Sequence, residues 1–284
     1  MRNHWFFPAL ALIMLASAAP VFGQESASAL AVARRSPLPV AESREQLPQG
    51  TVIPVLLETT LDPRRSKAGQ RVVATLGQDI SLANEGVIRV RSKLLGQVTQ
   101  VGGDSGRATL TVRFDRILPR KGNAPVALDV RLRAIASPLE VADSGQTTTT
   151  SIGWDNPPAV WTTVQIGGDV VYRGGGQVVN LSGETVGKPV HGGLFTQWSG
   201  VLAQVSNPAG SACQNLPLSR RPQSVWIFSA DACGVYGLKG VLSYRNLASG
   251  EILFSAPQQV KIPGGSALLL TVATPTSSTL AAEQ

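Results

Sequence analysis

Alternation of apolar and polar residues is the clearest pattern in this chain. In 108–115 every second residue is apolar, from Ala108 to Phe114, and Thr, Arg and Asp stand between them. The same alternation recurs in 126–133, where Val and Leu alternate with Ala, Asp and Arg. A period of two over this length is typical of strands that bury one face. Shorter apolar segments predict further strands at 52–57, 71–76, 87–90 and 94–101. Strands at this spacing fit a small barrel or sandwich over 47–137, and we predict the barrel.

Glycine and threonine set the next part, 138–195, apart. A run of four threonines at 147–150 is followed by Gly pairs and a Gly triplet, with short β-like pieces at 160–166, 170–172 and 177–181. Gly-rich loops can bind phosphate, but this segment has neither a Walker lysine pattern nor a Gly-x-Gly-x-x-Gly that opens a helix. We interpret 138–195 as a flexible Gly/Thr/Pro-rich connector.

Apolar segments return in 196–275 and predict a second β-rich, sandwich-like domain. The strand candidates there are 225–229, 240–244, 251–255, 259–262 and 267–272. Residues 276–284 are expected to form a frayed tail. The predicted fold is therefore all-β, a small barrel followed by a second β-domain. The 29 glycines and 19 prolines agree with short strands joined by turns.

The first 23 residues have the pattern of a secretory signal peptide. Arg2 precedes an almost wholly apolar stretch that is followed by small residues. Cleavage after Gly23 is favoured, and cleavage after Ala18 also fits. An uncleaved anchor is the rival interpretation, but the apolar run is shorter than the ~20 residues of a spanning helix and prolines interrupt it. We expect an exported protein, periplasmic or extracellular, with a flexible tether at 24–46 and no transmembrane span in the mature chain.

Two cysteines, Cys213 and Cys233, are the only ones in the chain. In an oxidising compartment such a pair is expected to form a disulfide. A metal site is the alternative, but two cysteines with one mature histidine make a poor ligand set. We therefore predict a disulfide and neither a metal nor another cofactor.

Positive charge is concentrated in the predicted barrel. Residues 47–137 hold fourteen Lys and Arg against seven Asp and Glu, whereas 138–284 hold seven against eight. A basic β-surface attracts polyanions over long range. The candidate anion-binding residues are Arg89, Arg91, Lys93, Arg113, Arg131 and Arg133. The simpler interpretation is an ordinary solvated surface with some charge bias. Phe114 is the only aromatic residue of this part, which argues against a stacking platform for single-stranded nucleic acid.

Three segments of the predicted barrel resemble the C-terminal barrel domain of the TrbI/VirB10-like family. Residues 50–57, Gly-Thr-Val-Ile-Pro-Val-Leu-Leu, resemble its first barrel strand. Residues 87–96 resemble its Leu-Ile-Pro-x-Gly-Ser-x-Leu-x-Gly segment, with Arg89 and Arg91 in place of the Pro and Gly. Residues 106–122 resemble its strand and turn ending in Arg-Ile-x-x-Pro-x-Gly. The resemblance covers about a quarter of the chain and implies the barrel fold for 50–122.

This sequence also lacks several segments on which the function of that family depends. Its pore-forming members carry an inner-membrane helix, a Pro-rich stalk and a helical hairpin in the barrel, and none of these is visible in this sequence. A free-standing barrel in the cell envelope is what the resemblance implies, with a scaffold or docking role rather than a pore. An accessory part of a secretion or conjugation apparatus remains an alternative.

Catalytic patterns are weak. His191 is the only histidine after the leader, and no Gly-x-Ser-x-Gly elbow occurs. Carboxylates for glycoside hydrolysis are available, and Trp154, Trp161 and Trp198 could line a glycan cleft, so an envelope glycan hydrolase is a second alternative. The main expectation is a non-enzymatic envelope protein that docks a polyanion, a lipid surface or a partner protein through its basic barrel, with no role in cytoplasmic nucleic-acid binding.

Overall fold

The computed structural model describes residues 47–82, 86–104, 106–120, 124–144, 162–239 and 243–273. The predicted leader, tether and tail lie outside these residues. Within them the chain forms eighteen strands and one short helix. The predicted all-β class is therefore confirmed.

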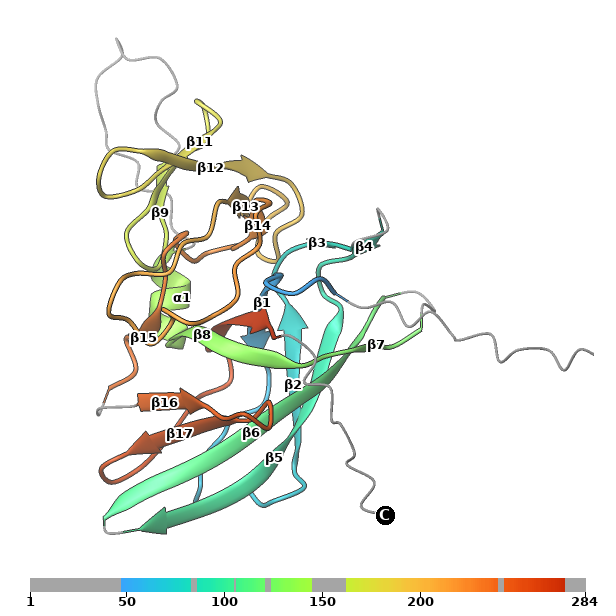
Figure 1. Ribbon diagram of the computed structural model, residues 1–284, viewed down its shortest axis with the longest axis vertical. Helices are drawn as coiled ribbons and strands as arrows, with labels where there is room; N and C mark the ends of the chain where they lie inside the picture. The colour runs from blue at the N-terminus through green and yellow to red at the C-terminus, as the bar shows by residue number, and fades with distance from the viewer. Residues whose placement is uncertain are drawn as a thin grey trace, which may run out of the picture. The chain divides into compact units, whose positions relative to one another are not determined.

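Ten strands form one sheet that curls into a nearly closed barrel (Figure 1). Its neighbours run in the order β15, β8, β18, β1, β2, β5, β6, β17 and β16, and β7 pairs with β6. The strands are β1 Val52–Leu57, β2 Arg71–Leu76, β5 Lys93–Asp104, β6 Arg107–Leu118, β7 Val126–Ala127, β8 Val130–Ala136, β15 Gly234–Tyr236, β16 Ser243–Asn246, β17 Ile252–Ala256 and β18 Ala267–Val272. All pairs are antiparallel except β15 with β8.

The period-two pattern correctly predicts which side chains of β6 face the interior of the barrel. Leu110, Val112 and Phe114 of β6 are buried in the interior, and Arg113 between them is exposed. Strand β17 pairs with β6 and adds Phe254 opposite Leu110 to the same core. The barrel therefore needs strands from both ends of the chain.

Asn246 and Tyr244 of β16 both form hydrogen bonds to β8 across the gap where the barrel would otherwise stay open, and the Tyr244 hydroxyl donates to the Arg133 carbonyl. The Asn246 Oδ1 accepts from the Leu132 N–H at 2.7 Å, and its Nδ2 donates to the Leu132 carbonyl at 2.8 Å. A carboxamide offers the same donor and acceptor as a peptide group. Asn246 thus substitutes for a strand partner and closes the barrel at this edge.

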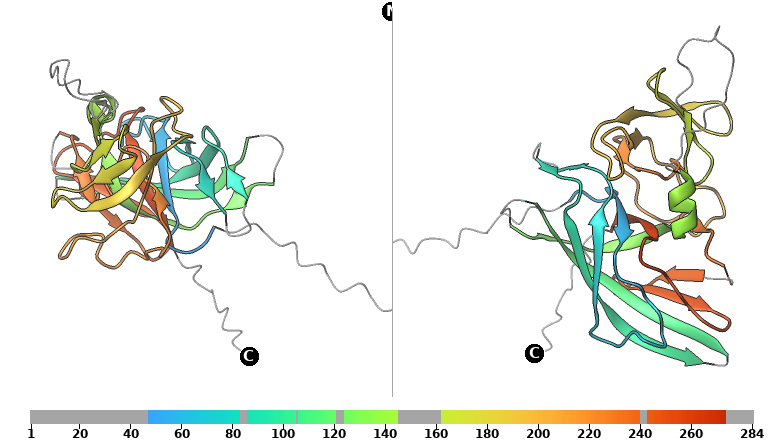
Figure 2. Two further views of the ribbon diagram at one scale, coloured as in Figure 1. Left: turned by 90° about the horizontal axis from the view of Figure 1, so that it is seen from above. Right: turned by 180° about the vertical axis from the view of Figure 1, so that it is seen from behind.

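A second sheet of six strands is inserted between β8 and β15. Its order is β14, β13, β12, β11, β10 and β9. The bounds are β9 Thr162–Val164, β10 Val170–Tyr172, β11 Gln177–Val179, β12 Thr185–Val190, β13 Gly200–Ala203 and β14 Gln223–Ser224. A two-stranded arm, β3 Ile80–Ser81 with β4 Val87–Ile88, and the helix α1 Pro138–Ser144 complete the elements. Figures 1 and 2 show the six-stranded sheet at one end of the barrel and the tip of the β5–β6 hairpin at the other.

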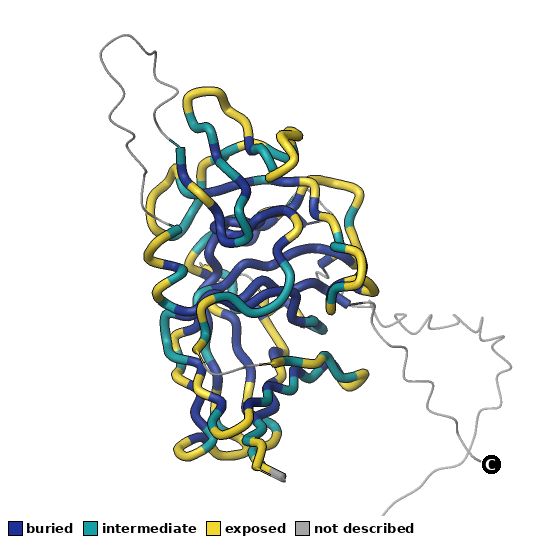
Figure 3. The backbone as a smooth tube through the Cα atoms, turned by 90° about the vertical axis from the view of Figure 1, so that its left-hand side faces the viewer, coloured by how far each residue is buried: buried dark blue, intermediate teal, exposed yellow. Residues whose placement is uncertain are grey.

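Strand β18 belongs to two hydrophobic cores at once. Leu268 and Leu270 point into the barrel, whereas Ala267 and Leu269 point outward to a second core with residues of the six-stranded sheet. All six residues of β18 are buried. Figure 3 shows the buried backbone concentrated in the middle, with exposed loops at both ends. Burial on both faces explains why five of the six residues of this strand are apolar, with Thr271 as the exception.

The predicted boundaries between two domains and a connector are wrong. Residues 43–284 form one compact unit. The barrel takes β15 to β18 from the predicted second domain, and the predicted connector supplies β9 to β12 of the inserted sheet. Short local patterns reveal strands but not their partners, because pairing depends on contacts far apart in sequence.

The predicted strand at 225–229 is also wrong. This stretch is buried but irregular, and Trp226 has a φ of 53°, a left-handed conformation that is uncommon for a bulky residue. Its indole packs on Gly77, where a Cβ atom would lie 2.4 Å from the Trp226 Cε3. Core burial, not strand pairing, accounts for the apolar run.

Gln78 ties the barrel to the inserted sheet. Its Oε1 accepts from the Val201 N–H at 3.0 Å and from the Trp226 N–H at 2.8 Å, and its Nε2 donates to the Val201 carbonyl at 2.9 Å. The side chain is 1% exposed. Without this carboxamide the N–H groups of Val201 and Trp226 would lose their acceptor, whereas the Val201 carbonyl would keep the bond that it accepts from the Val225 N–H at 3.1 Å.

The cysteines form the predicted disulfide, Cys213–Cys233. It joins the loop after β13 to the segment before β15. This loop packs over the outward face of β8, where the Cys213 Sγ lies 3.3 Å from the Arg133 carbonyl oxygen. The disulfide therefore fastens a cover over β8.

Replacing Gln78 by leucine should lower the free energy of unfolding by about 3 kcal/mol, because buried backbone groups would be left without partners. The measurement is the midpoint of urea unfolding. The matched control is Gln97→Leu on the exposed face of β5, which should change stability by no more than about 0.5 kcal/mol. Equal effects of the two substitutions would contradict the assigned role of Gln78.

Replacing both cysteines by serine should destabilise the protein by about 3 kcal/mol, because the closed loop of 20 residues gains freedom in the unfolded chain. Thermal unfolding of the double variant, compared with the oxidised wild type, measures this. A reduced wild-type sample should match the variant. If reduction leaves the melting temperature unchanged, the bridge does not restrain the cover over β8.

Candidate functional site

The six basic residues predicted to bind anions do not form one surface. Arg89 pairs with Asp79 at 2.9 Å, and Lys93 pairs with Glu58. Hydrogen bonds from Lys93 and Thr75 lower the pKa of the Glu58 carboxyl. These two cations already have carboxylate partners, so they attract a further anion less strongly.

The other four differ in exposure and in the groups around them. Arg91 is exposed, with a φ of 68°. Arg113 is exposed and faces Glu251, whose pKa is lowered by hydrogen bonds from Ser249 and Thr99 and, to a smaller extent, by the Arg113 charge. Arg131 is half-buried and lines a hollow of about 300 Å³ together with side chains of β16. These cations therefore do not act as one patch.

Among the six candidate anion-binding residues, Arg133 differs most from the prediction. Its side chain points out of the barrel, as the alternation indicates, but it is fully buried, with 0% exposure. The guanidinium donates to the Asn207 Oδ1 at 2.6 Å and to the Ser206 carbonyl. Burial lowers its pKa to about 10. Arg133 therefore holds the cover over β8 in place and is not available to a ligand.

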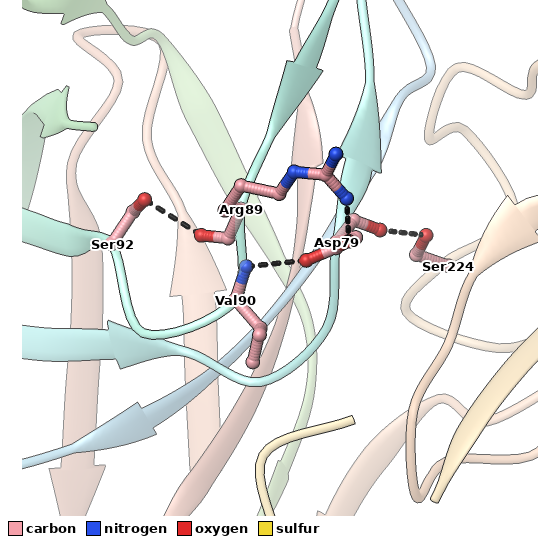
Figure 4. A network of polar contacts seen from close by, with 5 residues as sticks. All are labelled: Asp79, Arg89, Val90, Ser92 and Ser224. Atoms are coloured by element: carbon pink, nitrogen blue, oxygen red, sulfur yellow. Dashed lines mark hydrogen bonds and ion pairs between the residues drawn. The ribbon is translucent and has the colours of Figure 1, made fainter. Parts of the chain in front are cut away.

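Asp79 organises the arm formed by β3 and β4, as Figure 4 shows. Its carboxylate accepts from the Arg89 Nη1 at 2.9 Å and from the Val90 N–H at 2.6 Å. Its backbone carbonyl accepts from the Ser224 hydroxyl at 2.6 Å. Ser92 Oγ in turn donates to the Arg89 carbonyl at 2.6 Å. Asp79 thus links the arm to β14 of the inserted sheet.

A basic groove of about 700 Å³ lies between this arm and the inserted sheet. One wall comes from the arm and another from β12, β13 and the segment before β14. The lining residues are Pro48, Gln49, Thr51, Ile80, Ser81, Leu82, Lys188, Leu202, Leu218, Ser219, Arg220, Arg221, Pro222, Gln223 and Ser224. The network of Figure 4 braces the two walls against each other.

Sheet register explains how residues distant in sequence meet in the groove. Lys188 lies opposite Leu202 in the β12–β13 pair, and Leu202 lies opposite Ser224 in the β13–β14 pair. Residues in one row across a sheet share a face. Arg220 and Arg221 lie in the segment before β14, separated from it by Pro222, and line the same groove.

The groove is positively charged. Lys188, Arg220 and Arg221 are exposed, and the groove lining contains no Asp or Glu. Within the described part of the chain, the three ion pairs involve other residues. Charge counting missed this site because its cations lie in 138–284, whose net charge is −1. The adjacent pair Arg220-Arg221 was the one local signal.

Two residues available for catalysis, His191 and Asp169, have protein contacts of their own. The His191 ring packs against the Trp198 ring at an interplanar angle of 49°, with ring centroids 4.1 Å apart. Asp169 is 2% exposed, its Oδ2 accepts from the Ala230 N–H at 2.8 Å, and burial raises its pKa. Trp154 and Trp161 lie outside the described residues. Across the described ranges, no three His, Cys, Asp or Glu side chains gather as a metal site.

No helix in the described part of the chain is long and apolar enough to cross a membrane.

Comparison with known proteins gives no relative: no family model, curated protein or solved structure matches this chain. The TrbI/VirB10-like segments fall on β1, on β4 with the start of β5, and on β6. That resemblance remains a prediction.

Replacing Asp79 by alanine should loosen the arm and cost about 1 kcal/mol of stability, because a partly exposed carboxylate with two hydrogen bonds is lost. Amide hydrogen exchange at Val90 should become faster. Asp115→Ala is the control, since Asp115 makes only an exposed contact of 3.6 Å with Arg116. Unchanged exchange at Val90 would show that Asp79 does not hold the arm.

Proposed function

We propose that this chain is an exported, non-enzymatic binding protein that docks an acidic segment of a partner protein in the basic groove. The observation that carries this proposal is the meeting of Lys188, Arg220 and Arg221 in a groove whose lining holds no carboxylate. Cations in a concave site focus the electrostatic field and speed the approach of an anionic partner.

Apolar residues in the groove favour a polypeptide over a polymeric anion. Ile80, Leu82 and Leu202 line it beside the cations, and Leu218 is 45% exposed. A peptide can place carboxylates on the arginines and apolar side chains on the leucines. The lining contains no aromatic residue, whereas single-stranded nucleic acids bind mainly by stacking on aromatic rings. A protein segment with alternating acidic and apolar residues fits both features.

The location of this activity rests on two observations. The N-terminal residues have the pattern of a cleaved leader, and the cysteines are paired, as is usual in oxidising compartments. Both support the periplasm or the extracellular space as the place where the groove meets its partner.

The double substitution Arg220→Gln with Arg221→Gln should weaken binding of a labelled peptide of alternating Glu and Leu by about tenfold, with each exposed contact contributing on the order of 0.7 kcal/mol. Fluorescence anisotropy at low and high salt measures the affinity. High salt should weaken the wild type and reduce the difference between the two proteins, because salt screens exposed charges.

The matched control is Arg64→Gln with Arg65→Gln, another adjacent and exposed arginine pair, in the loop at the opposite end of β1. This variant loses the same charge outside the groove and should bind like the wild type. Equal weakening of both double variants would contradict the groove as the site. An all-Glu peptide should bind less tightly than the alternating one, and equal affinity would contradict the apolar contacts.

A further inference from the structure

A hollow of about 300 Å³ lies at the gap in the barrel that the side chains of β16 bridge to β8. Its lining includes Arg131 of β8, Arg245 of β16 and Asn215 of the loop that carries Cys213. None of the residues that line this hollow also lines the basic groove. The hollow is therefore a separate concave site, independent of the function proposed above.

Two cationic side chains without a protein acceptor line this hollow. Arg131 is half-buried and Arg245 is exposed, and neither guanidinium has a hydrogen bond or an ion pair with any residue of the described ranges. The Arg131 nitrogens are not among the buried side-chain atoms that lack a partner, so solvent reaches them. The lining contains no Asp or Glu. Both guanidinium groups are therefore accessible to an anion from solvent.

The loop wall of the hollow is held in place by Asn207. Its Nδ2 donates to the Leu216 carbonyl at 2.8 Å and to the Gln214 carbonyl at 3.4 Å, one on either side of Asn215. Its Oδ1 accepts from the buried Arg133 at 2.6 Å. The exposed carboxamide of Asn215 is therefore presented from a braced backbone, and it adds a neutral N–H donor to the two cations.

The strand wall is fixed in the same way. Tyr244 and Asn246 use their hydroxyl and carboxamide for hydrogen bonds to the backbone of β8. Arg245 lies between these two residues, so the start of its side chain is fixed relative to β8. Because the polar groups of Tyr244 and Asn246 already have partners, a ligand would be recognised by the two arginines and Asn215.

We propose that this hollow binds the phosphate group of a small organic phosphate monoester. The planar fork of a guanidinium matches two phosphate oxygens, so Arg131 and Arg245 together neutralise a dianion, and Asn215 donates to a remaining oxygen. A carboxylate has one charge and two oxygens, which satisfies only one arginine. The volume corresponds to roughly ten water molecules, so an organic group the size of a sugar ring fits beside Leu216 and the Tyr244 ring.

The test uses the oxidised wild-type protein and four probes that share one sugar ring: glucose 6-phosphate, glucose 6-sulfate, glucuronate and glucose. The readout is the shift of the backbone amide resonances of Asn215 and Arg245 at neutral pH and constant ionic strength. Glucose 6-phosphate should shift both in a saturable way, and the two singly charged anions should bind at least about tenfold more weakly, since each leaves one arginine without a full partner. Glucose should cause no shift.

The same spectra locate the site. Shifts at Asn215 and Arg245 should saturate at a lower concentration of glucose 6-phosphate than any shift at Arg221 in the basic groove. No saturable shift at Asn215 and Arg245, or equal affinity for the three anions, would overturn the proposal. Saturation first at Arg221 would place the phosphate in the basic groove and would overturn it as well.

The double substitution Arg131→Gln with Arg245→Gln should weaken glucose 6-phosphate binding by about tenfold or more. The matched control, Arg64→Gln with Arg65→Gln, removes the same charge from an exposed pair outside the hollow and should bind like the wild type. Unchanged affinity in the folded double variant, or equal weakening in the control, would contradict the assignment. The probe comparison on the wild type decides the proposal even if the double variant does not fold.

Discussion

The outward face of β1, β8 and β18 carries a cluster of apolar residues, and the need to bury this cluster governs the rest of the structure. A barrel normally buries only its interior, but here Val52, Ala134 and Leu269 point outward into a second core. The chain meets this requirement by inserting β9 to β14 between β8 and β15. The inserted sheet is therefore not an independent domain, because its core includes the outer wall of the barrel.

Covering an apolar wall also brings polar groups into the interior, and each of them has a specific role. Gln78 joins the two cores through three hydrogen bonds. Arg133 anchors the loop that carries Cys213. The basic groove lies between the arm and strands β12 to β14 of the inserted sheet. The same packing that stabilises the fold thus also forms the walls of this groove.

The local sequence pattern was sufficient to predict strands in which apolar and polar residues alternate. It was insufficient to predict any feature that depends on residues far away in the sequence. The alternation in 108–115 predicted β6 and its buried face, but nothing in it indicates that β17, about 140 residues later, pairs with it. Arg133 was placed on the correct face of β8, yet the loop that buries it comes from residues 206–216. The cations of the groove are 32 positions apart in sequence and become neighbours only through the register of β12 to β14. Charge counting along the chain cannot detect a site of this kind.

The position of β18 sets the order in which the fold can be completed. This strand lies between β8 and β1, although it is the last of the described strands in chain order. Until it arrives, the earlier barrel strands have two open edges, and the outward wall that supports the inserted sheet is incomplete. Contacts so distant in sequence form slowly. Closure of the barrel and support of the inserted sheet therefore both depend on the pairing of β18 with β1 and β8.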